Sequence, residues 1–531
     1  MNTFSELSET DPTAPHGDEV ISPPRWIGCV VGLSSGIFAV SIGMVVGALG
    51  NSRSSLDLVG SSFIDRTPLW LKEQAIQTFG TNDKTALEVG MIGVLIIASV
   101  VLGLLSSRRL APLQIGILVF GLLGAVSASE HVGAGFISII APLCGVAAGL
   151  FAAHRLHGYL TNQRKLSRTP QQSRVPLGWD RRSFIRTVGA FSALSGGGVL
   201  FARSREQARV QQLQDLTQIP LPPLATDNAP ADPATDFHPT DPYITPNDSF
   251  YRIDTALSFP RVDRAKWKLR IHGLVEREKL FSIDDLQALP QVERIITLCC
   301  VSNEVGGPYI GNAVWRGVLL KDVLESCGIK KNAEQVLSTS LDGWTSGFPV
   351  STAMDGRDAL IAIGMNGQPL PLMHGYPARL VVPGLYGYVS ATKWLSEINI
   401  TTWSAEQGYW IPRGWSRDAP VKTQSRIDVP RKGESISAGK FRLAGVAWAQ
   451  HTGVQQVELR IDRGAWQSCD LGVDLTDDAW RQWIFDWDAT AGEHTIQVRA
   501  SDKSGYTQTE EVRRVDPDGA TGWHTREIRV I

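Results

Sequence analysis

The chain has 531 residues, and its 51 lysines and arginines nearly balance its 53 aspartates and glutamates, for a formal net charge of −2. A chain of this length makes about three domains, and near-neutral charge argues against nucleic acid as the main partner, which requires a concentrated basic face. Six cysteines are too few for a disulfide-stapled framework, and the sequence has neither a CxxCH for covalent haem nor paired CxxC motifs for zinc or an iron–sulfur cluster.

The first third of the chain contains four apolar stretches without a charged residue. They are 26–49, 89–105, 110–129 and 132–153. Each is long enough, or nearly so, to cross a bilayer, which takes about 17–25 residues. They predict a four-span α-helical membrane region over 26–153 behind a cytoplasmic tail at 1–25; the alternative is a set of long core helices in a soluble domain.

The positions of Lys and Arg orient these spans. Arg108 and Arg109 lie between the second and third spans, and residues 154–186 hold eight Lys and Arg against one acid, Asp180. Because segments rich in Lys and Arg stay in the cytoplasm, we expect both to lie inside. Residues 51–88 then form an external loop.

Residues 180–186 read Asp-Arg-Arg-Ser-Phe-Ile-Arg and lead into a mildly apolar stretch at 187–202. This order resembles a twin-arginine translocation signal, which exports folded proteins; the alternative is an arginine pair that anchors an ordinary membrane helix. No A-x-A cleavage site follows, so we expect a basic cytoplasmic linker at 154–186, a fifth span or signal segment at 187–202, and an extracytoplasmic chain after Arg203.

The exported part begins with a linker at 203–239. Eight prolines between residues 220 and 246 make its end stiff and extended. The remaining chain is rich in tryptophan, because twelve of the sixteen tryptophans lie after residue 314. Strand-like alternation separated by turn residues predicts an all-β sandwich over 424–531.

The block Thr-Leu-Cys-Cys-Val-Ser-Asn at 297–303 is the most informative part of the sequence. It indicates an apolar strand that ends in Cys299 and Cys300, followed by a glycine-rich loop. A thiolate there is a candidate nucleophile or soft-metal ligand, and the commoner alternative is a buried, inert cysteine. Neighbours on a strand point to opposite faces, so a disulfide between the two is not expected and only one can face a site.

Six blocks in order carry a family resemblance. They are 245–251 (TPNDSFY), 297–303 (TLCCVSN), 315–324 (WRGVLLKDVL), 365–371 (MNGQPLP), 374–379 (HGYPAR), and 381–384 (VVPG) with 393–394 (KW). With these blocks, residues 240–531 resemble the sulfite oxidase family of molybdenum enzymes. The resemblance implies Mo-molybdopterin as the cofactor, an α+β molybdopterin-binding domain at 240–423, and an Ig-like dimerisation domain at 424–531 that would make a homodimer.

The resemblance also implies roles for single residues. It makes Cys300 the single protein ligand of molybdenum and a catalytic residue. It also aligns Trp344 with the active-site tyrosine of the family, which makes Trp344 the second catalytic candidate. Cofactor contacts are expected from Asn247, Tyr251, Arg252, Thr339, His374, Arg379, Ser390 and Lys393. A thiolate suits a high-valent metal, and the phosphate and pterin need cations and hydrogen-bonding groups. The local alternative is that Arg379 and Lys393 are solvated strand-end charges and His374 a turn residue.

Three departures from the family concern the substrate. Glu304 and Val305 stand where arginines are expected, Trp344 replaces the tyrosine, and the arginine expected before Lys393 is absent from 388–392. A carboxylate in place of cations repels a dianion such as sulfite. We therefore expect a neutral oxide or sulfoxide rather than sulfite. The opening motif departs as well, with Arg-Ile-Asp at 252–254 where sulfite oxidases have arginine and histidine.

The sequence thus predicts a membrane-anchored, extracytoplasmic molybdenum oxidoreductase that performs two-electron oxygen-atom transfer on a small molecule. Without its own haem or iron–sulfur motif, it needs an external redox partner, which is a quinone, a cytochrome or a membrane subunit. His131 and His154 lie at opposite ends of one span and cannot bind one haem together. Three alternatives stay open: a sulfite oxidase or dehydrogenase, a non-catalytic extracytoplasmic receptor or scaffold, and a transporter whose exported domain only senses substrate.

Overall fold

The computed structural model describes residues 24–79, 83–107, 109–131, 135–161, 181–216, 221, 242–260 and 262–531. The predictions for the tail up to residue 23, for the linker at 162–180 and for most of the proline-rich linker lie outside these residues. The chain divides into two compact units. One consists of residues 1–62, 85–130 and 134–206, and the other of residues 63–84, 131–133 and 207–531.

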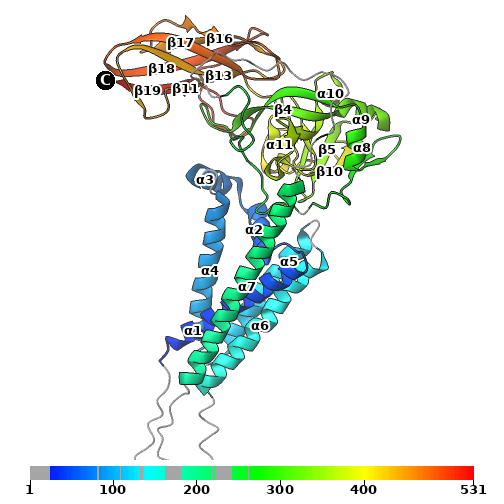
Figure 1. Cartoon of the computed structure of the whole chain (residues 1–531), viewed down its shortest axis with the longest axis vertical. Helices are drawn as coiled ribbons and strands as arrows, with labels where there is room; N and C mark the ends of the chain where they lie inside the picture. Colours follow the sequence, from blue (N-terminus) through cyan, green and yellow to red (C-terminus); the bar gives the residue numbers. More distant parts are fainter. Residues whose placement is uncertain are drawn as a thin grey trace, which may run out of the picture. The chain divides into compact units, whose positions relative to one another are not determined.

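The first unit is helical. Five helices of the described residues are long and apolar enough to cross a membrane, as predicted. They are α1 (Ile27–Leu49), α4 (Asp83–Leu105), α5 (Ala111–Glu130), α6 (Phe136–Thr161) and α7 (Arg181–Leu216) (Figure 1). α1 and α5 both pack along α6. Gly28 of α1 lies so close to the backbone of Gly103 in α4 that neither has room for a side chain, a contact typical of helices packed in a bilayer.

The last of these helices is longer than the sequence indicated. α7 begins inside the twin-arginine motif and runs to Leu216, whereas the sequence assigns 187–202 to the span and 203–239 to a linker. Residues 203–216 contain strong helix formers and neither Gly nor Pro, so the helix continues beyond the apolar stretch. The helix therefore continues across the boundary predicted at residue 203, although the division between the two compact units falls nearby, between residues 206 and 207.

Residues 51–88, predicted as an external loop, contain two helices. These are α2 (Ser55–Arg66) and α3 (Leu69–Phe79). Pro68 precedes α3 directly, where its missing N–H costs the helix no hydrogen bond. Residues 63–84 of this segment belong to the second unit.

The second unit begins with an α+β domain that contains two sheets. The first has the order β2 (Lys279–Phe281), β1 (Leu269–Gly273), β10 (Leu395–Thr401), β5 (Gln335–Ser340) and β6 (Thr345–Pro349). The second has the order β3 (Val292–Cys299), β4 (Ile310–Leu319), β7 (Leu360–Met365) and β8 (Gln368–Pro369), with β9 (Arg379–Val381) also paired to β7. Short helices complete it: α8 (Ile283–Ala288), α9 (Leu320–Cys327), α10 (Val350–Met354) and α11 (Gly387–Ser390).

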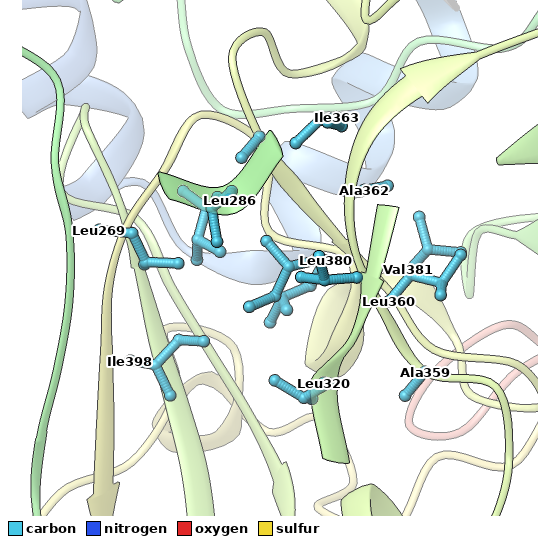
Figure 2. Packing of buried hydrophobic residues seen from close by; sticks show 14 of the residues in the cluster. Leu269, Leu286, Leu320, Ala359, Leu360, Ala362, Ile363, Leu380, Val381 and Ile398 are labelled. Carbon is cyan, nitrogen blue, oxygen red and sulfur yellow. The ribbon is translucent and has the colours of Figure 1, made fainter. Parts of the chain in front are cut away.

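Both sheets contribute to one hydrophobic core. Figure 2 shows Leu269 and Ile398 of the first sheet together with Leu360 and Leu380 of the second and Leu286 of α8. Every residue of β7 is buried, which explains its continuous apolar run in place of the alternation of a half-exposed strand. The core fixes β9, which begins with Arg379, and the end of β3, which Cys300 follows.

The C-terminal part is built from two further sheets, and its first strand begins at Gln424, the predicted boundary (Figure 1). One sheet has the order β11 (Gln424–Val429), β13 (Gly439–Trp448), β17 (Arg481–Ala489) and β16 (Asp470–Leu471). The other has the order β12 (Ser435–Ile436), β19 (His524–Val530), β18 (Gly492–Asp502), β14 (Val454–Ile461) and β15 (Gln467–Ser468). The predicted alternation is present, because Val457 and Leu459 are fully buried between exposed or half-buried neighbours.

Candidate cofactor site

The two adjacent cysteines lie where β3 ends, and both are buried free thiols. The backbone N–H of Cys300 donates to the carbonyl of Tyr309 (2.9 Å), and the N–H of Asn303 donates to the carbonyl of Cys300 (3.0 Å). The side-chain oxygen of Asn303 then accepts from the N–H of Tyr309 (2.8 Å). These bonds close residues 300–309 into a compact loop that holds Cys300 in place.

The two thiols face different surroundings, as the alternation along a strand requires. Burial raises the pKa of the Cys300 thiol, while Ser302 and the charge of Lys393 act in the opposite direction. Burial also raises the pKa of Cys299, but the groups that oppose it there are Asn303 and Arg426. Cys300 is thus the thiol on which the charge of Lys393 acts, and its role as the molybdenum ligand stays a prediction.

A buried ion cluster lies beside this thiol, and its centre is Asp254, whose side chain is 6% exposed. Lys393 Nζ lies 2.5 Å from one carboxylate oxygen of Asp254, and Arg252 Nε donates to the same oxygen at 3.0 Å. Lys84 Nζ contacts the other oxygen and also donates to the carbonyl of Ala256 (2.6 Å). Burial alone would raise the pKa of Asp254, but Lys393, Lys84 and Arg252 lower it far below its usual range.

His374 and Arg379 flank the cluster. His374 Nε2 lies 2.8 Å from the backbone carbonyl of Asn247, and burial together with neighbouring cations lowers the pKa of His374 to about 4. Arg379 donates to the carbonyl of His374 (3.1 Å) and lies over the ring of Trp315. Burial lowers the pKa of Arg379 to about 10, so the guanidinium stays charged at neutral pH.

Gly375 brings these groups together. It adopts a φ of 113°, and a Cβ added to it would lie 3.1 Å from atoms of both Arg379 and Lys393. A side chain here would strain the backbone and collide with two candidate cofactor ligands. This is the physical reason for the His-Gly pair in the sequence.

The opening motif is tied to the turn between β7 and β8. The amide nitrogen of Asn366 donates to the side-chain oxygen of Asn247 (2.8 Å) and to the carbonyl of Thr245 (3.0 Å). Tyr251 follows in the same segment, with its ring stacked on Phe250. Burial and the two cysteines raise the pKa of Tyr251, and Arg379 opposes them, so the phenol lies near the thiols.

Six of the predicted residues are therefore linked to Cys300 or Asp254, directly or through one another. They are Asn247, Tyr251, Arg252, His374, Arg379 and Lys393. Arg379 is 5% exposed and the Lys393 side chain 11% exposed, so neither is a solvated strand-end charge.

Three other predicted residues have local contacts instead. Ser390 is fully buried, and its hydroxyl donates to the carbonyl of Tyr386 (3.0 Å), which borders the same short helix, α11. Thr339 is a half-buried residue of β5, and Trp344 lies in the turn that connects β5 to β6. The backbone N–H of Trp344 donates to Asp342 (3.1 Å). The roles of these three stay predictions.

Sequence reasoning missed Lys84 and the role of Asp254. Asp254 was visible only as a departure from the family's opening motif, and a carboxylate among predicted phosphate ligands was the available signal. Lys84 offered no local signal, because it lies 170 residues before its partner.

The residues of the site are suited to a metal ion that is bound by an anionic organic cofactor. Among the described residues there is no group of three or more His, Cys, Asp or Glu that could hold a metal ion. One thiolate, a surplus of buried cations and a neutral histidine suit a molybdenum dithiolene with a phosphate tail.

Comparisons with known proteins agree with this geometry. Residues 256–410 match the family model of the oxidoreductase molybdopterin binding domain. Human mitochondrial sulfite oxidase is 30% identical over 308 residues, which cover 49% of this chain and 56% of that protein. The uncharacterized oxidoreductase YuiH of Bacillus subtilis is 36% identical over 153 residues, which cover 29% of this chain and 74% of that protein.

Two further similarities are to a solved structure and to a longer enzyme. Sulfane dehydrogenase SoxCD from Paracoccus pantotrophus aligns with a TM-score of 0.49 at 24% identity, over 54% of this chain and 82% of that chain. NADH nitrate reductase of Hordeum vulgare is 26% identical over 335 residues, which cover 51% of this chain and 36% of that protein. The match to human sulfite oxidase spans little more than half of that relative.

The fold and site thus define an oxidoreductase domain that binds molybdopterin. The chain belongs to the sulfite oxidase family of molybdopterin-dependent oxidoreductases, as its motifs predicted.

Proposed function

We propose that this protein is a membrane-anchored, extracytoplasmic oxidoreductase that transfers an oxygen atom to or from a small neutral oxide or sulfoxide. The observation that carries the proposal is the buried Cys300 thiol beside a cation-rich cluster of matching family residues. When bound, Mo-molybdopterin supplies the two-electron redox chemistry, and the protein positions it.

Each residue of the site has a physical task in this proposal. Cys300 provides the thiolate for molybdenum, and Arg252, Arg379 and Lys393 provide donors for the phosphate and pterin. His374 is neutral at pH 7 because its pKa is about 4, so one ring nitrogen can donate to the Asn247 carbonyl while the other accepts a hydrogen bond. Trp344 at the β5–β6 turn is proposed to face the substrate, and Thr339 and Ser390 to complete the cofactor contacts.

The charge of the loop after Cys300 supports a neutral substrate. Glu304 is exposed in this loop, and its backbone carbonyl accepts from the N–H of Gly307 (2.8 Å), which fixes the turn. A carboxylate here raises the energy of an approaching dianion. The alternative, sulfite oxidation, is favoured by the activity named for the human relative.

The location and partners follow from the helices. Five membrane-length helices, the basic segment at 154–186 and the twin-arginine motif at the start of α7 support an anchor with the catalytic domain on the extracytoplasmic side. A quinone, a cytochrome or a separate membrane subunit would exchange electrons with the site. The two C-terminal sheets support an Ig-like sandwich, which would pair with a second copy of the chain.

Molybdenum and pterin per chain test the proposal most directly. We would compare the purified full-length protein with Cys300→Ala and with Cys299→Ala, a neighbouring buried thiol on the opposite face. We expect about one molybdenum per chain in the parent and in Cys299→Ala, and weak or labile metal in Cys300→Ala. Reduction of a sulfoxide or amine oxide by a dye-linked assay should then exceed sulfite oxidation.

Three results would contradict parts of the proposal. A parent without molybdenum, from cells whose other molybdoenzymes are loaded, would favour the receptor or scaffold. Loss of metal in Cys299→Ala alone would show that the ligand was misassigned. Faster turnover of sulfite than of any neutral oxide would favour a sulfite dehydrogenase.

A further inference from the structure

Asp254 uses its hydrogen-bonding capacity on cations of the protein itself. One carboxylate oxygen accepts from Lys393 Nζ (2.5 Å) and from Arg252 Nε (3.0 Å). The other accepts from Arg252 Nη2 (3.5 Å) and from Lys84 Nζ. A carboxylate offers about four acceptor positions, and these four contacts occupy them. Asp254 therefore acts through the cations that it holds, not as a direct contact of a cofactor.

Lys393 is the most buried of these cations. Its side chain is 11% exposed, against 22% for Lys84 and 31% for Arg252. Its ammonium group donates to Asp254 and to the carbonyl of Met373 (3.3 Å). An ammonium group has three N–H donors, so these two bonds leave one donor of Lys393 for a ligand.

We propose that Asp254 is a positioning residue that orients the ammonium group of Lys393 toward the cofactor. With one N–H held by a carboxylate and another by a carbonyl, the third N–H has a fixed direction. The inference rests on the proposed cofactor site. It gives a task to Asp254, which the sequence shows only as a departure from the family's opening motif.

Asp254 also keeps Lys393 charged. Burial and the charges of Arg379 and Arg252 lower the pKa of Lys393, Asp254 raises it, and the resulting pKa is about 8. An opposite charge at this distance shifts a pKa by about 1–3. A neutral residue at position 254 therefore lets Lys393 lose its proton at or below pH 7, and a neutral amine binds a phosphate more weakly than an ammonium group does.

The other groups around Lys393 keep their charge state between about pH 5.5 and 7.5. The pKa of His374 is about 4, and that of Arg379 is about 10. Burial raises the pKa of the Cys300 thiol, and the pKa of Asp254 is far below this range. Arg252 is a guanidinium and stays protonated. A change in cofactor retention across this range therefore reports on Lys393.

The experiment follows molybdenum and pterin per chain while full-length protein in detergent is dialysed at about pH 5.5 and at about pH 7.5. We expect Asp254→Asn to release pterin about tenfold faster than the parent at the higher pH, as for one lost charge-assisted hydrogen bond. At the lower pH, where Lys393 is charged in both proteins, the difference should shrink. Asp254→Glu keeps a carboxylate and should keep the pH profile of the parent. The control Asp284→Asn removes a carboxylate that is 74% exposed and should resemble the parent at both pH values.

A double-mutant cycle tests whether Asp254 acts through Lys393. In a Lys393→Met background, Asp254→Asn should cause no further loss of pterin, because the residue that Asp254 positions is already absent. The double variant also buries no unpaired lysine, so it keeps the test available if Asp254→Asn alone fails to fold.

A purely structural role for Asp254 would give the opposite pH dependence. Loss of the carboxylate leaves a buried, unpaired cation, and this cost is greatest at the lower pH, where Lys393 is charged. If pterin were lost only because the fold loosens, Asp254→Asn would therefore lose more of it at about pH 5.5 than at about pH 7.5.

The outcomes separate this inference from the proposed function. Parent-like retention in Asp254→Asn, a loss that is equal or greater at the lower pH, or an undiminished effect in the Lys393→Met background would each overturn the positioning role while Cys300 stays the metal ligand. A parent without molybdopterin would overturn both.

Discussion

The Asp254→Asn substitution removes the carboxylate that Lys84, Arg252 and Lys393 contact, and leaves Lys393, the most buried of these cations, without its anionic partner. The Asp254 side chain is 6% exposed and contacts Lys84, Arg252 and Lys393. Removing one partner of a buried ion pair costs about 3–5 kcal/mol because the remaining charge is uncompensated. For a domain of this size, that loss lowers the unfolding midpoint by about 6–20 °C. We expect this result in protein without cofactor.

The pH dependence of the loss has a definite sign. The pKa of Asp254 is depressed, so its contribution is present above its unfolded value of about 3.9 and is lost only as the pH falls through the lower folded value. Burial lowers the pKa of Lys393 from 10.5 to about 8, against the effect of Asp254. The unfolded chain therefore binds the proton of Lys393 more tightly than the folded protein does. The contribution of Lys393 to stability consequently rises with pH between about 8 and 10.5, the folded and unfolded pKa values of Lys393.

The substitution should consequently be most damaging at pH 5–7, where all the cations are charged, and less damaging above pH 8, where Lys393 is neutral in the parent as well. Tryptophan fluorescence can follow unfolding of this part of the chain, because twelve of the sixteen tryptophans lie after residue 314. The control is Asp284→Asn, which removes a carboxylate that is 74% exposed and 2.8 Å from Arg264. It should cost about 0–1 kcal/mol. A loss equal to that of the control, or one constant from pH 5 to 10, would refute the buried-cluster reasoning.

Three further predictions address the site, export and substrate. Gly375→Ala should lower stability by about 1–3 kcal/mol and reduce bound molybdenum, because the residue has a φ of 113° and its Cβ would press on Lys393; a fully loaded, stable variant would contradict this. Replacing Arg181 and Arg182 by lysines should keep the C-terminal part on the cytoplasmic side in protease-protection assays, and unchanged exposure would show that the pair only anchors a helix. Glu304→Arg should raise the ratio of kcat/KM for sulfite to kcat/KM for a sulfoxide by about tenfold. This change corresponds to about 1.4 kcal/mol of transition-state stabilisation. An unchanged ratio would show that the charge at residue 304 does not determine substrate selectivity.

Periodicity and composition were sufficient for the elements whose stability depends on one repeating property. Uncharged length predicted α1, α4, α5 and α6, because a span needs little more than continuous apolar surface. Alternation predicted β14 and β18, whose inward residues are buried in the core of the C-terminal part. The end of α7 was missed because helix propensity continues after hydropathy falls, and the proline-rich composition further on drew the boundary too early.

Side-chain pairing could not be predicted in the same way. The family blocks placed His374, Arg379 and Lys393 in one site, since the motifs encode the turn at Gly375 and the start of β9. The ion pair between Lys84 and Asp254 depends on how distant segments meet, and no local pattern of sequence encodes that. Ser390 shows the opposite case, in which a local contact competes with a role expected from the family motif. Its hydroxyl, at the end of a short helix, bonds a carbonyl one turn back, and this bond competes with the expected contact to the cofactor.

The C-terminal part also takes part in holding the candidate metal ligand. Thr297 of β3 donates its backbone N–H to the carbonyl of Asp478 (2.9 Å), and its hydroxyl accepts from the N–H of Trp480 (2.7 Å). Beyond Cys300, Arg426 donates to the carbonyl of Gly307 (3.0 Å). The strand before the thiol and the loop after it are thus both fixed by residues beyond 424. Since a ligand is useful only when its geometry is held by its surroundings, the C-terminal sheets are part of the framework of the site, and changes in their packing should alter metal retention without touching a cofactor contact.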